Sequence, residues 1–233
     1  MEKKTVLITG ASRGIGKQLA LAFSKNNWNV CGCYKNNAPE LEIQNSKFFK
    51  TDISNYKEVK DLIKNTVGKF GKINCVINNA SIASGATIFK MTDEMWNSVL
   101  KTDLSGTFYM VKESLKQMIK QRSGSIINIA SISAFKSYVG SASYSASKAG
   151  VIALTKTAAR EGGRFGVTVN AILPGFHLSG MGVNSSDEYI DIVKKESVLN
   201  TTTDIKELTN FIVFLSQVKT VSGQTFNFDS RLL

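Results

Sequence analysis

Short apolar runs rich in β-branched residues alternate with longer amphipathic stretches from one end of this 233-residue chain to the other. The longer stretches carry apolar residues at helical spacing. The expected strands are 5–9, 28–34, 46–51, 73–78, 124–130, 167–173 and 224–228, and the expected helices are 17–26, 56–70, 94–121, 143–164 and 204–217. Repeated βαβ units of this kind predict an α/β fold: a Rossmann-like, doubly wound, mostly parallel seven-stranded sheet with helices on both faces.

The chain shows no linker rich in Pro, Gly or Ser, so we expect a single domain over residues 1–233. Its longest segment without an expected element is 175–203, and a long loop in a compact domain is usually a binding loop. We therefore interpret residues 176–203 as a substrate loop. Gly180 and Gly182 would let this loop close as a lid.

Charge and hydropathy exclude several classes of protein. Lys and Arg number 29 against 18 Asp and Glu, a net charge of +11, but the charges are scattered without a basic block. We expect no nucleic-acid partner, while an acidic protein or a phosphorylated ligand stays open. Because no apolar run is long enough for a membrane helix or a signal peptide, we expect a cytoplasmic protein with no membrane partner.

The cysteines and the histidine do not form a metal-binding pattern. Cys31, Cys33 and Cys75 include no C-x-x-C pair, and His177 is the single histidine. We therefore expect no metal and interpret the cysteines as buried thiols. His177 falls in the expected substrate loop, where it either contacts substrate or is incidental.

A glycine-rich segment, TGASRGIG at 9–16, joins the first strand to a helix. Glycines let the backbone approach a ligand closely, and the N–H groups and dipole at a helix start attract phosphate oxygens. The spacing differs from the usual G-x-G-x-x-G, so an ordinary glycine-rich turn is the alternative. The candidates for binding a dinucleotide pyrophosphate are Gly10, Ser12, Arg13, Gly14, Ile15 and Gly16.

The end of the second strand favours NADP(H) over NAD(H). An NAD site usually has Asp or Glu there, whereas this chain has Tyr34-Lys35-Asn36-Asn37. Lys35, together with Arg13 in the glycine loop, would bind a 2′-phosphate. The alternative is that both are surface cations.

Two further pairs of residues close strands at the edge where open α/β sheets bind ligands. Asp52 and Ile53 follow the third strand, and Asn79 and Ala80 follow the fourth. Asp52 would accept a hydrogen bond from the adenine amine, or would instead cap the helix that begins near residue 56.

Three polar side chains at the same edge suggest catalysis. Tyr144 and Lys148 lie four residues apart at the start of a helix, on one face of it. A tyrosine that acts as an acid or base near neutral pH needs a nearby positive charge, which Lys148 supplies. Ser131 closes the strand at 124–130, where its hydroxyl would polarise a carbonyl oxygen.

Together these motifs resemble the short-chain dehydrogenase/reductase family. The resemblance covers residues 3–229 and includes TGASRGIG at 9–16, NNA at 78–80, Ser131, YSASK at 144–148 and PG at 174–175. It implies an enzyme that moves hydride between a nicotinamide and a carbonyl or alcohol carbon. Tyr144 would be the acid/base, Lys148 would also bind the nicotinamide ribose, and Ser131 would hold the substrate oxygen.

The resemblance also implies that Pro174 and Gly175 belong to the cofactor site, and that the chain forms a homotetramer or a homodimer. The sequence departs from the family at three places. Asp103 takes the position of an asparagine that helps to hold a water chain to the lysine, and its charge would affect the proton exchange of Tyr144 and Lys148. Ser81 replaces a glycine, and Asp-Ser-Arg at 229–231 replaces Asp-Gly-Gly.

Within the family, IINIAS at 126–131, YSASKAGVIALTK at 144–156 and TVNAILPGF at 168–176 are most similar to 3-oxoacyl-acyl-carrier-protein reductases, which use NADPH. The small-molecule substrate would then be a 3-oxoacyl thioester and the partner acyl carrier protein, which is acidic. Arg122 matches a carrier-docking arginine of that group. The second docking arginine has no aligned counterpart, because Phe165 falls there with Arg164 one place earlier.

Two other functions stay open. One is a reductase for another ketone, a diketone or a sugar, with the same catalytic residues and a different substrate loop. The other is a nucleotide-binding sensor or scaffold whose chemistry is weakened by Asp103.

Overall fold

Seven parallel strands form one sheet at the centre of the protein, which a computed structural model describes over residues 3–136, 138–183 and 185–232. The strand order is β3-β2-β1-β4-β5-β6-β7. The strands are β1 (Thr5–Thr9), β2 (Asn29–Tyr34), β3 (Ser46–Lys50), β4 (Cys75–Asn78), β5 (Gly124–Ile129), β6 (Val167–Leu173) and β7 (Thr225–Asn227). The predicted doubly wound fold is confirmed. The sheet was predicted to be mostly parallel, and every described strand pair is parallel.

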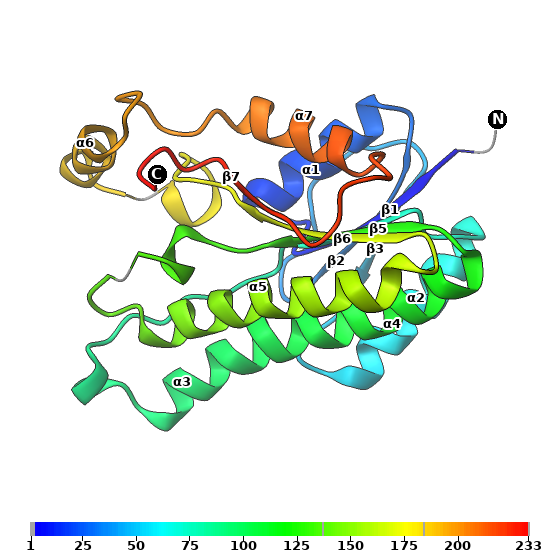
Figure 1. The fold of residues 1–233 in the computed structure, drawn as a ribbon, viewed down its shortest axis with the longest axis horizontal. Coiled ribbons are helices and arrows are strands. Elements are labelled where there is room, and N and C mark those ends of the chain that lie inside the picture. Colours follow the sequence, from blue (N-terminus) through cyan, green and yellow to red (C-terminus); the bar gives the residue numbers. More distant parts are fainter. Residues whose placement is uncertain (1–2, 137, 184, 233) are drawn as a thin grey trace.

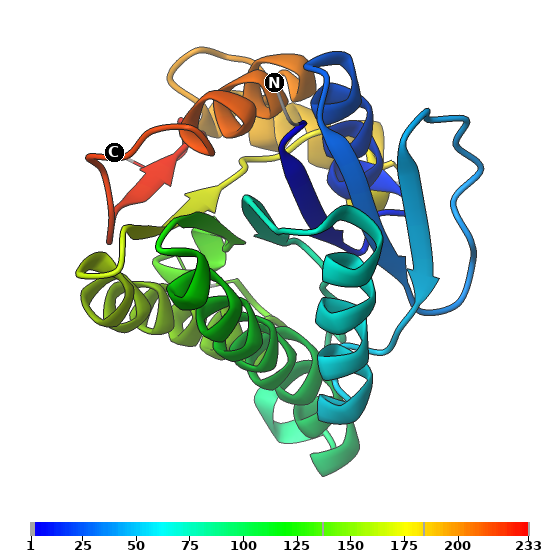
Figure 2. The same cartoon turned by 90° about the vertical axis from the view of Figure 1, so that its right-hand side faces the viewer.

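Helices cover both faces of the sheet (Figures 1 and 2). The long helices are α1 (Gly14–Lys25), α2 (Tyr56–Phe70), α4 (Thr107–Gln121), α5 (Ala142–Gly163) and α7 (Ile205–Leu215). Helices α1 and α7 pack on one face, and α2, α4 and α5 pack on the other. Strands β1 to β3 are added towards one edge of the sheet and β4 to β7 towards the other, so the strand order reverses between β1 and β4, the place where open α/β sheets bind ligands.

Alternate side chains of each strand enter the two core layers. In β1, Val6 and Ile8 pack with Phe23 of α1, while Leu7 packs with Met110 of α4. Successive strand residues point to opposite faces, and both faces are covered here, so a continuous apolar run is fully buried. This is why TVLIT at 5–9 reads as uniformly apolar rather than alternating.

The stretch expected as one helix at 94–121 has three parts. They are α3 (Asp93–Val99), a π-helical turn η2 (Leu100–Gly106) and α4. Gly106 lies against Ile53, and a Cβ on Gly106 would come within 2.9 Å of Ile53 Cγ1. The π-turn carries Asp103, and such turns often occur at functional sites.

The segment 175–203, expected to lack secondary structure, contains a short 3-10 turn η4 (Gly180–Gly182) and helix α6 (Asp187–Glu196). That expectation was wrong, although the sequence holds signals for α6. Ser186 caps it by accepting from the Tyr189 amide, and Asp187 and Glu188 lie in its first turn. Two further short turns are η1 (Ile88–Lys90) and η3 (Ile132–Ala134).

The three cysteines are buried free thiols, as predicted. Burial raises the pKa of Cys31 and of Cys33 to about 12, so both are protonated near neutral pH. None of the helices in the described ranges is long and apolar enough to cross a membrane.

Candidate active site

The glycine loop between β1 and α1 is packed so closely that side chains would not fit. Gly10 and Gly14 have φ values of 64° and 55°, in the left-handed region. A Cβ on Gly10 would lie 2.9 Å from the Ala80 Cα, and one on Gly16 would lie 2.2 Å from the Gly10 carbonyl oxygen. The loop therefore requires glycine at these positions, which favours a ligand-binding turn over an ordinary one.

The amino end of α1 is open to an anion. Its N-cap residue, Arg13, makes no side-chain capping hydrogen bond, and its first turn carries no acidic residue. Helices α2, α3, α6 and α7, in contrast, are capped by the side chains of Asn55, Thr92, Ser186 and Asp204. Uncapped N–H groups and the helix dipole suit a phosphate at this end of α1.

Hydrogen bonds fasten the end of β4 to the glycine loop. The Thr9 hydroxyl accepts from the Asn79 amide at 2.9 Å and from the Ala80 amide at 3.0 Å. The Asn79 side chain donates to the carbonyl oxygens of Thr9 and Gly10 at 3.0 and 3.2 Å. The two motifs predicted at this edge, TGASRGIG and NNA, are thus one structural unit.

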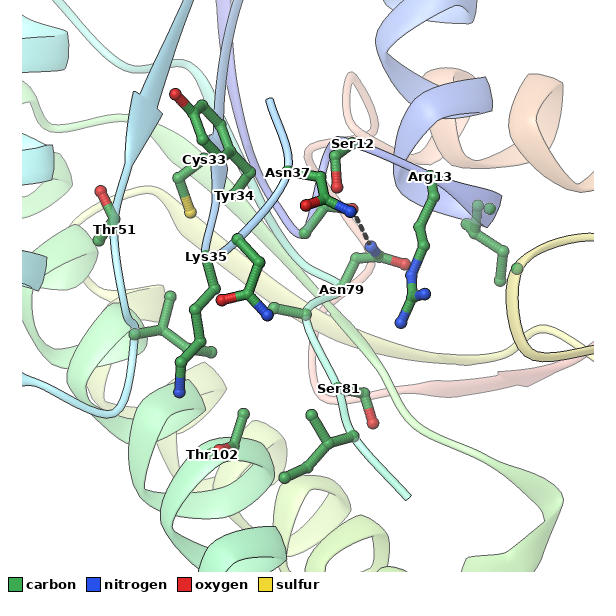
Figure 3. Close-up of a pocket in the computed structure, with 18 of the residues that line it drawn as sticks. Ser12, Arg13, Cys33, Tyr34, Lys35, Asn37, Thr51, Asn79, Ser81 and Thr102 are labelled. Atoms are coloured by element: carbon green, nitrogen blue, oxygen red, sulfur yellow. Dashed lines mark hydrogen bonds between the residues drawn. The ribbon is translucent and has the colours of Figure 1, made fainter. Parts of the chain in front are cut away.

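A cavity of about 370 Å³ lies between the glycine loop and the ends of β2, β3 and β4 (Figure 3). Ten of the predicted cofactor residues line it: Gly10, Ser12, Arg13, Gly14, Ile15, Lys35, Asp52, Ile53, Asn79 and Ala80. Sequence reasoning did not place Cys33, Tyr34, Asn36, Asn37, Ala38, Thr51, Ser81, Ile82, Thr102, His177 and Gly180 in this lining. Four of these, Tyr34, Asn36, Thr51 and Ser81, directly adjoin a predicted cofactor residue, and that adjacency was the available signal.

Two cations border the cavity from opposite sides, with Asn79 between them (Figure 3). The exposed Arg13 comes from the glycine loop. Lys35 extends from the end of β2 and pairs with Asp52, the Nζ and Oδ2 atoms being 2.7 Å apart. The cavity therefore has a positive rim that one carboxylate partly offsets.

Asp52 binds its own turn and does not cap α2. Its Oδ1 accepts from the amide and hydroxyl of Ser54 at 3.0 and 2.7 Å, whereas Asn55 caps the helix. Burial acts to raise the pKa of Asp52, but the hydrogen bonds from Lys35 and Ser54 outweigh it and lower the pKa. The capping alternative was wrong, and Asp52 lies in the cavity wall as an ionised acceptor.

The first turns of α5 carry Tyr144 and Lys148 on one face. Lys148 Nζ lies 5.4 Å from the centre of the Tyr144 ring. Lys148 is only 3% exposed and donates to the Ile129 carbonyl oxygen at the end of β5, 3.2 Å away. Ser131 follows that strand, and its hydroxyl accepts from the Ser133 amide at 3.1 Å. The loop after β5 thus brings Ser131 to the end of the sheet from which α5 begins.

Asp103 is fully buried and pairs with Lys148. Its Oδ2 lies 3.3 Å from Lys148 Nζ, and its Oδ1 accepts from the Ile82 amide at 2.9 Å. The Ser81 hydroxyl donates to the same Oδ2. Sequence reasoning missed Ser81 as a contact of Asp103, although it had marked both positions as departures from the family.

The segment after β6 closes on itself and on the glycine loop. Gly175 has a φ of 73°, and a Cβ there would come within 2.0 Å of the Thr203 hydroxyl. Gly180 lies so close to Gly14 that a Cβ on Gly14 would be 3.0 Å from the Gly180 Cα. Pro174 and Gly175 thus form the base of the segment and lie outside the cavity lining, which includes His177 and Gly180.

His177 is half-buried beside the cavity. Its Nδ1 lies 3.1 Å from the Ser179 hydroxyl. Burial lowers the pKa of His177 below its ordinary value of 6.5, so the imidazole is neutral near pH 7.

The two arginines predicted to dock a carrier share one aromatic ring. The guanidinium carbons of Arg122 and Arg164 lie 5.5 and 4.7 Å from the centre of the Phe165 ring. However, these residues follow the carboxyl ends of α4 and α5, whereas Tyr144 lies at the amino end of α5, at the other edge of the sheet (Figure 1). At 1.5 Å per helical residue, Tyr144 and Arg164 are about 30 Å apart. The structure does not bring the arginines to the sheet edge that carries Tyr144 of the same chain.

Comparisons with known proteins agree with this geometry. A model of the family described as short chain dehydrogenase matches residues 4–190. The 3-oxoacyl-acyl-carrier-protein reductase FabG of Staphylococcus epidermidis is 36% identical over 235 residues, 96% of each chain. The corresponding reductase of Synechocystis is 35% identical over 239 residues, 99% of this chain and 97% of its own.

Two solved structures share the fold over nearly the whole length. A variant of actinorhodin polyketide ketoreductase with NADPH superposes with a TM-score of 0.92 at 27% identity, covering 99% of this chain and 97% of that one. ElxO with NADP bound gives a TM-score of 0.89 at 29% identity and covers 98% of both chains.

Proposed function

Because this chain belongs to the short chain dehydrogenase family and is an NAD(P)-dependent oxidoreductase, we propose that it reduces the 3-oxo group of an acyl thioester with NADPH. The product is the 3-hydroxyacyl thioester. The observation that carries the proposal is the buried Lys148 beside Tyr144, at the sheet edge that also holds the glycine-loop cavity.

The residues around the cavity fit a dinucleotide phosphate. Gly10 and Gly16 leave no space for side chains, and the uncapped start of α1 provides N–H donors for a pyrophosphate. Arg13 and Lys35 supply positive charge where a 2′-phosphate would lie, which supports NADP(H) over NAD(H). When bound, the nicotinamide supplies the hydride that reduces the carbonyl carbon.

The protein's own groups handle the oxygen atom of the substrate. Ser131 donates a hydrogen bond to the carbonyl oxygen, and Tyr144 gives its phenolic proton to the alkoxide that develops. Lys148 keeps its positive charge beside the phenol and so stabilises the phenolate that is left. An ammonium group has three protons: one is donated to Ile129, one faces Asp103, and the third is available for the nicotinamide ribose.

The relatives and the charge support the thioester and its carrier. The Staphylococcus and Synechocystis relatives are named for acyl-carrier-protein-linked substrates, and the similarity covers at least 96% of this chain. A net charge of +11 favours association with an acidic carrier. We propose that the carrier docks on Arg122 and Arg164, which both contact the Phe165 ring, and that a carrier docked there serves the active site of another chain of the proposed assembly.

The remaining features of the proposal concern assembly and location. We propose that residues 176–203 act as the substrate loop of a single domain, with His177 beside the cavity. We also propose a homotetramer or a homodimer that works in the cytoplasm. Size-exclusion chromatography with light scattering will give the number of chains in the assembly.

NADPH consumption over a panel of substrates tests the proposed function. We expect 3-oxoacyl thioesters to have a higher kcat/KM than simple ketones, diketones or sugars, and NADPH to have a higher kcat/KM than NADH. A ketone or sugar with a higher kcat/KM than every thioester would instead identify the protein as a reductase for that class of substrate. NADPH binding without turnover of any substrate would support the sensor.

Docking is tested separately, because the arginines lie far from Tyr144. Arg122→Glu should reduce kcat/KM for a carrier-linked substrate about tenfold or more and leave a short thioester analogue unchanged. Lys25→Glu makes the same charge change at the exposed end of α1, on the other face of the sheet, and serves as the control. An equal loss on both substrates would reject the docking role of Arg122.

A further inference from the structure

The carboxylate of Asp103 connects the cofactor cavity to the catalytic lysine. Asp103 has no exposed surface and lies on the π-turn η2. On the cavity side, it accepts from the Ser81 hydroxyl and, at 2.9 Å, from the Ile82 amide. On the other side, its Oδ2 lies 3.3 Å from Lys148 Nζ.

We propose that Ser81 is a positioning residue that acts through Asp103 to set how strongly Lys148 stabilises the Tyr144 phenolate. The inference rests on the proposed function, in which Tyr144 is the proton donor. It adds a residue that contacts neither Tyr144 nor Lys148 in the described structure but lines the cofactor cavity (Figure 3).

Buried ion pairs are stable only when their remaining donors and acceptors are satisfied. Both carboxylate oxygens of Asp103 have partners, and the two that fix its orientation are the Ile82 amide and the Ser81 hydroxyl. Without the hydroxyl, Oδ2 would face Lys148 alone. The serine at position 81 and the aspartate at position 103 therefore work as one unit.

The sign of the effect follows from the charges. A carboxylate 3.3 Å from the ammonium offsets part of the positive charge that Tyr144 experiences. A hydrogen bond from Ser81 takes up part of the carboxylate charge and so weakens that offset. Besides Ser81, the groups that hydrogen-bond to this pair are the Ile129 carbonyl of β5 and the Ile82 amide, which carry no net charge, so the charges of this cluster in the described part of the chain are those of Asp103 and Lys148.

Ionisation of the Tyr144 phenol provides a test that needs no turnover. The phenolate absorbs in the near ultraviolet, and subtracting the spectrum of the Tyr144→Phe protein isolates this residue from the other tyrosines. We expect Asp103→Asn to move the midpoint of the titration about one pH unit lower, because the ammonium is no longer offset. Ser81→Ala should move it about half a unit higher, because the carboxylate keeps its full charge.

Two variants separate positioning from packing. Ser81→Thr keeps the hydroxyl and should restore the wild-type midpoint. Thr107→Val removes a 2.6 Å hydrogen bond to the backbone carbonyl of Asp103, not to its carboxylate, and should leave the midpoint unchanged. Ser81→Ala in the Asp103→Asn background should cause no further shift, because the group through which Ser81 acts has lost its charge.

An unchanged midpoint in Ser81→Ala, or the same shift with and without the Asp103 carboxylate, would overturn the inference. If Asp103→Asn does not fold because Lys148 is left unpaired, the Ala and Thr variants at position 81 decide the question alone. Failure of the proposed function would show differently, as an absence of NADPH consumption by the wild-type protein, whatever the phenol titration gives.

Discussion

Two sides of the site are held together by different means: the glycine-loop side, where we propose that the cofactor binds (the cofactor side), and the side of residues 176–203, where we propose that the substrate binds (the substrate side). On the cofactor side, backbone segments lie so close that Gly10 and Gly16 admit no side chain. On the substrate side, paired side chains hold the segment 176–203 and the carboxyl-terminal residues in place. These pairs are Lys136–Glu196 at 2.8 Å, Asp229–Arg231 at 2.5 Å and Ser197–Ser230 at 2.5 Å. In this chain, backbone packing fixes the cofactor side, whereas pairs of side chains hold the substrate side.

The largest effect is expected from Arg231→Met, on the substrate side. Arg231 and Asp229 are 6% and 3% exposed, and loss of the arginine leaves a buried carboxylate without its counter-charge. We expect the free energy of unfolding to fall by about 3–5 kcal/mol. Urea denaturation measures this change. A loss below about 1 kcal/mol would mean that the pair does not hold the carboxyl terminus.

The next largest effect is expected from Gly16→Ala, on the cofactor side. The added Cβ would lie 2.2 Å from the Gly10 carbonyl oxygen and 2.7 Å from Asn79 Nδ2. Overpacking of this kind costs about 1–3 kcal/mol, and we expect the Kd for NADPH to rise about tenfold or more. Fluorescence titration with NADPH measures this Kd. Gly163→Ala is the control and should bind NADPH normally, because nothing beyond the adjacent helix backbone lies within 4 Å of the new Cβ.

Lys136→Met should have a smaller effect, because its partner Glu196 and Lys136 itself are 39% and 36% exposed. Exposed ion pairs contribute about 1 kcal/mol or less. Urea denaturation at low salt should show a slightly smaller free energy of unfolding for the variant than for the wild-type protein. At high salt the two should agree, because salt screens the ion pair in the wild-type protein. A loss comparable to that of Arg231→Met would contradict the distinction between buried and exposed pairs on this side.

The smallest effect is expected from His177. Because burial lowers the pKa of His177 below 6.5, the unfolded chain binds a proton more readily than the folded one. The stability that neutral His177 contributes is therefore present above pH 6.5 and is lost as the pH falls below it. When the pH is lowered from above 6.5 to below it, the free energy of unfolding should fall less in His177→Gln than in the wild-type protein. An identical decline would mean that the imidazole is not desolvated.

The sequence predicted the cofactor side in detail because its chemistry is local. The residues from Gly10 to Gly16 are consecutive, and Lys35 follows directly from a strand end, so strand and helix assignment places them. The family resemblance indicated that the charge of Asp103 would affect Tyr144 and Lys148, but it did not predict that Asp103 and Lys148 pair directly, because no periodic pattern in the sequence signals the π-turn that carries Asp103.

The substrate side was less predictable for a related reason. Helix α6 is short, and its cap and charged ends went unrecognised within a long polar segment. The Arg231 side chain folds back onto Asp229, two residues earlier, and no periodic pattern in the sequence predicts such a contact. The separation of Arg164 from Tyr144 follows from the length of α5, which the sequence predicted. The contact that Arg122 and Arg164 share with Phe165 could not be predicted in this way.

The most direct measurement for the whole account is the rate of carbonyl reduction by Tyr144→Phe with saturating NADPH. Loss of the phenolic proton should lower kcat by about 10²- to 10⁴-fold, while the Kd for NADPH stays within a factor of about three of the wild-type value. Reduction at the wild-type rate in this variant would contradict the assignment of Tyr144 as the proton donor.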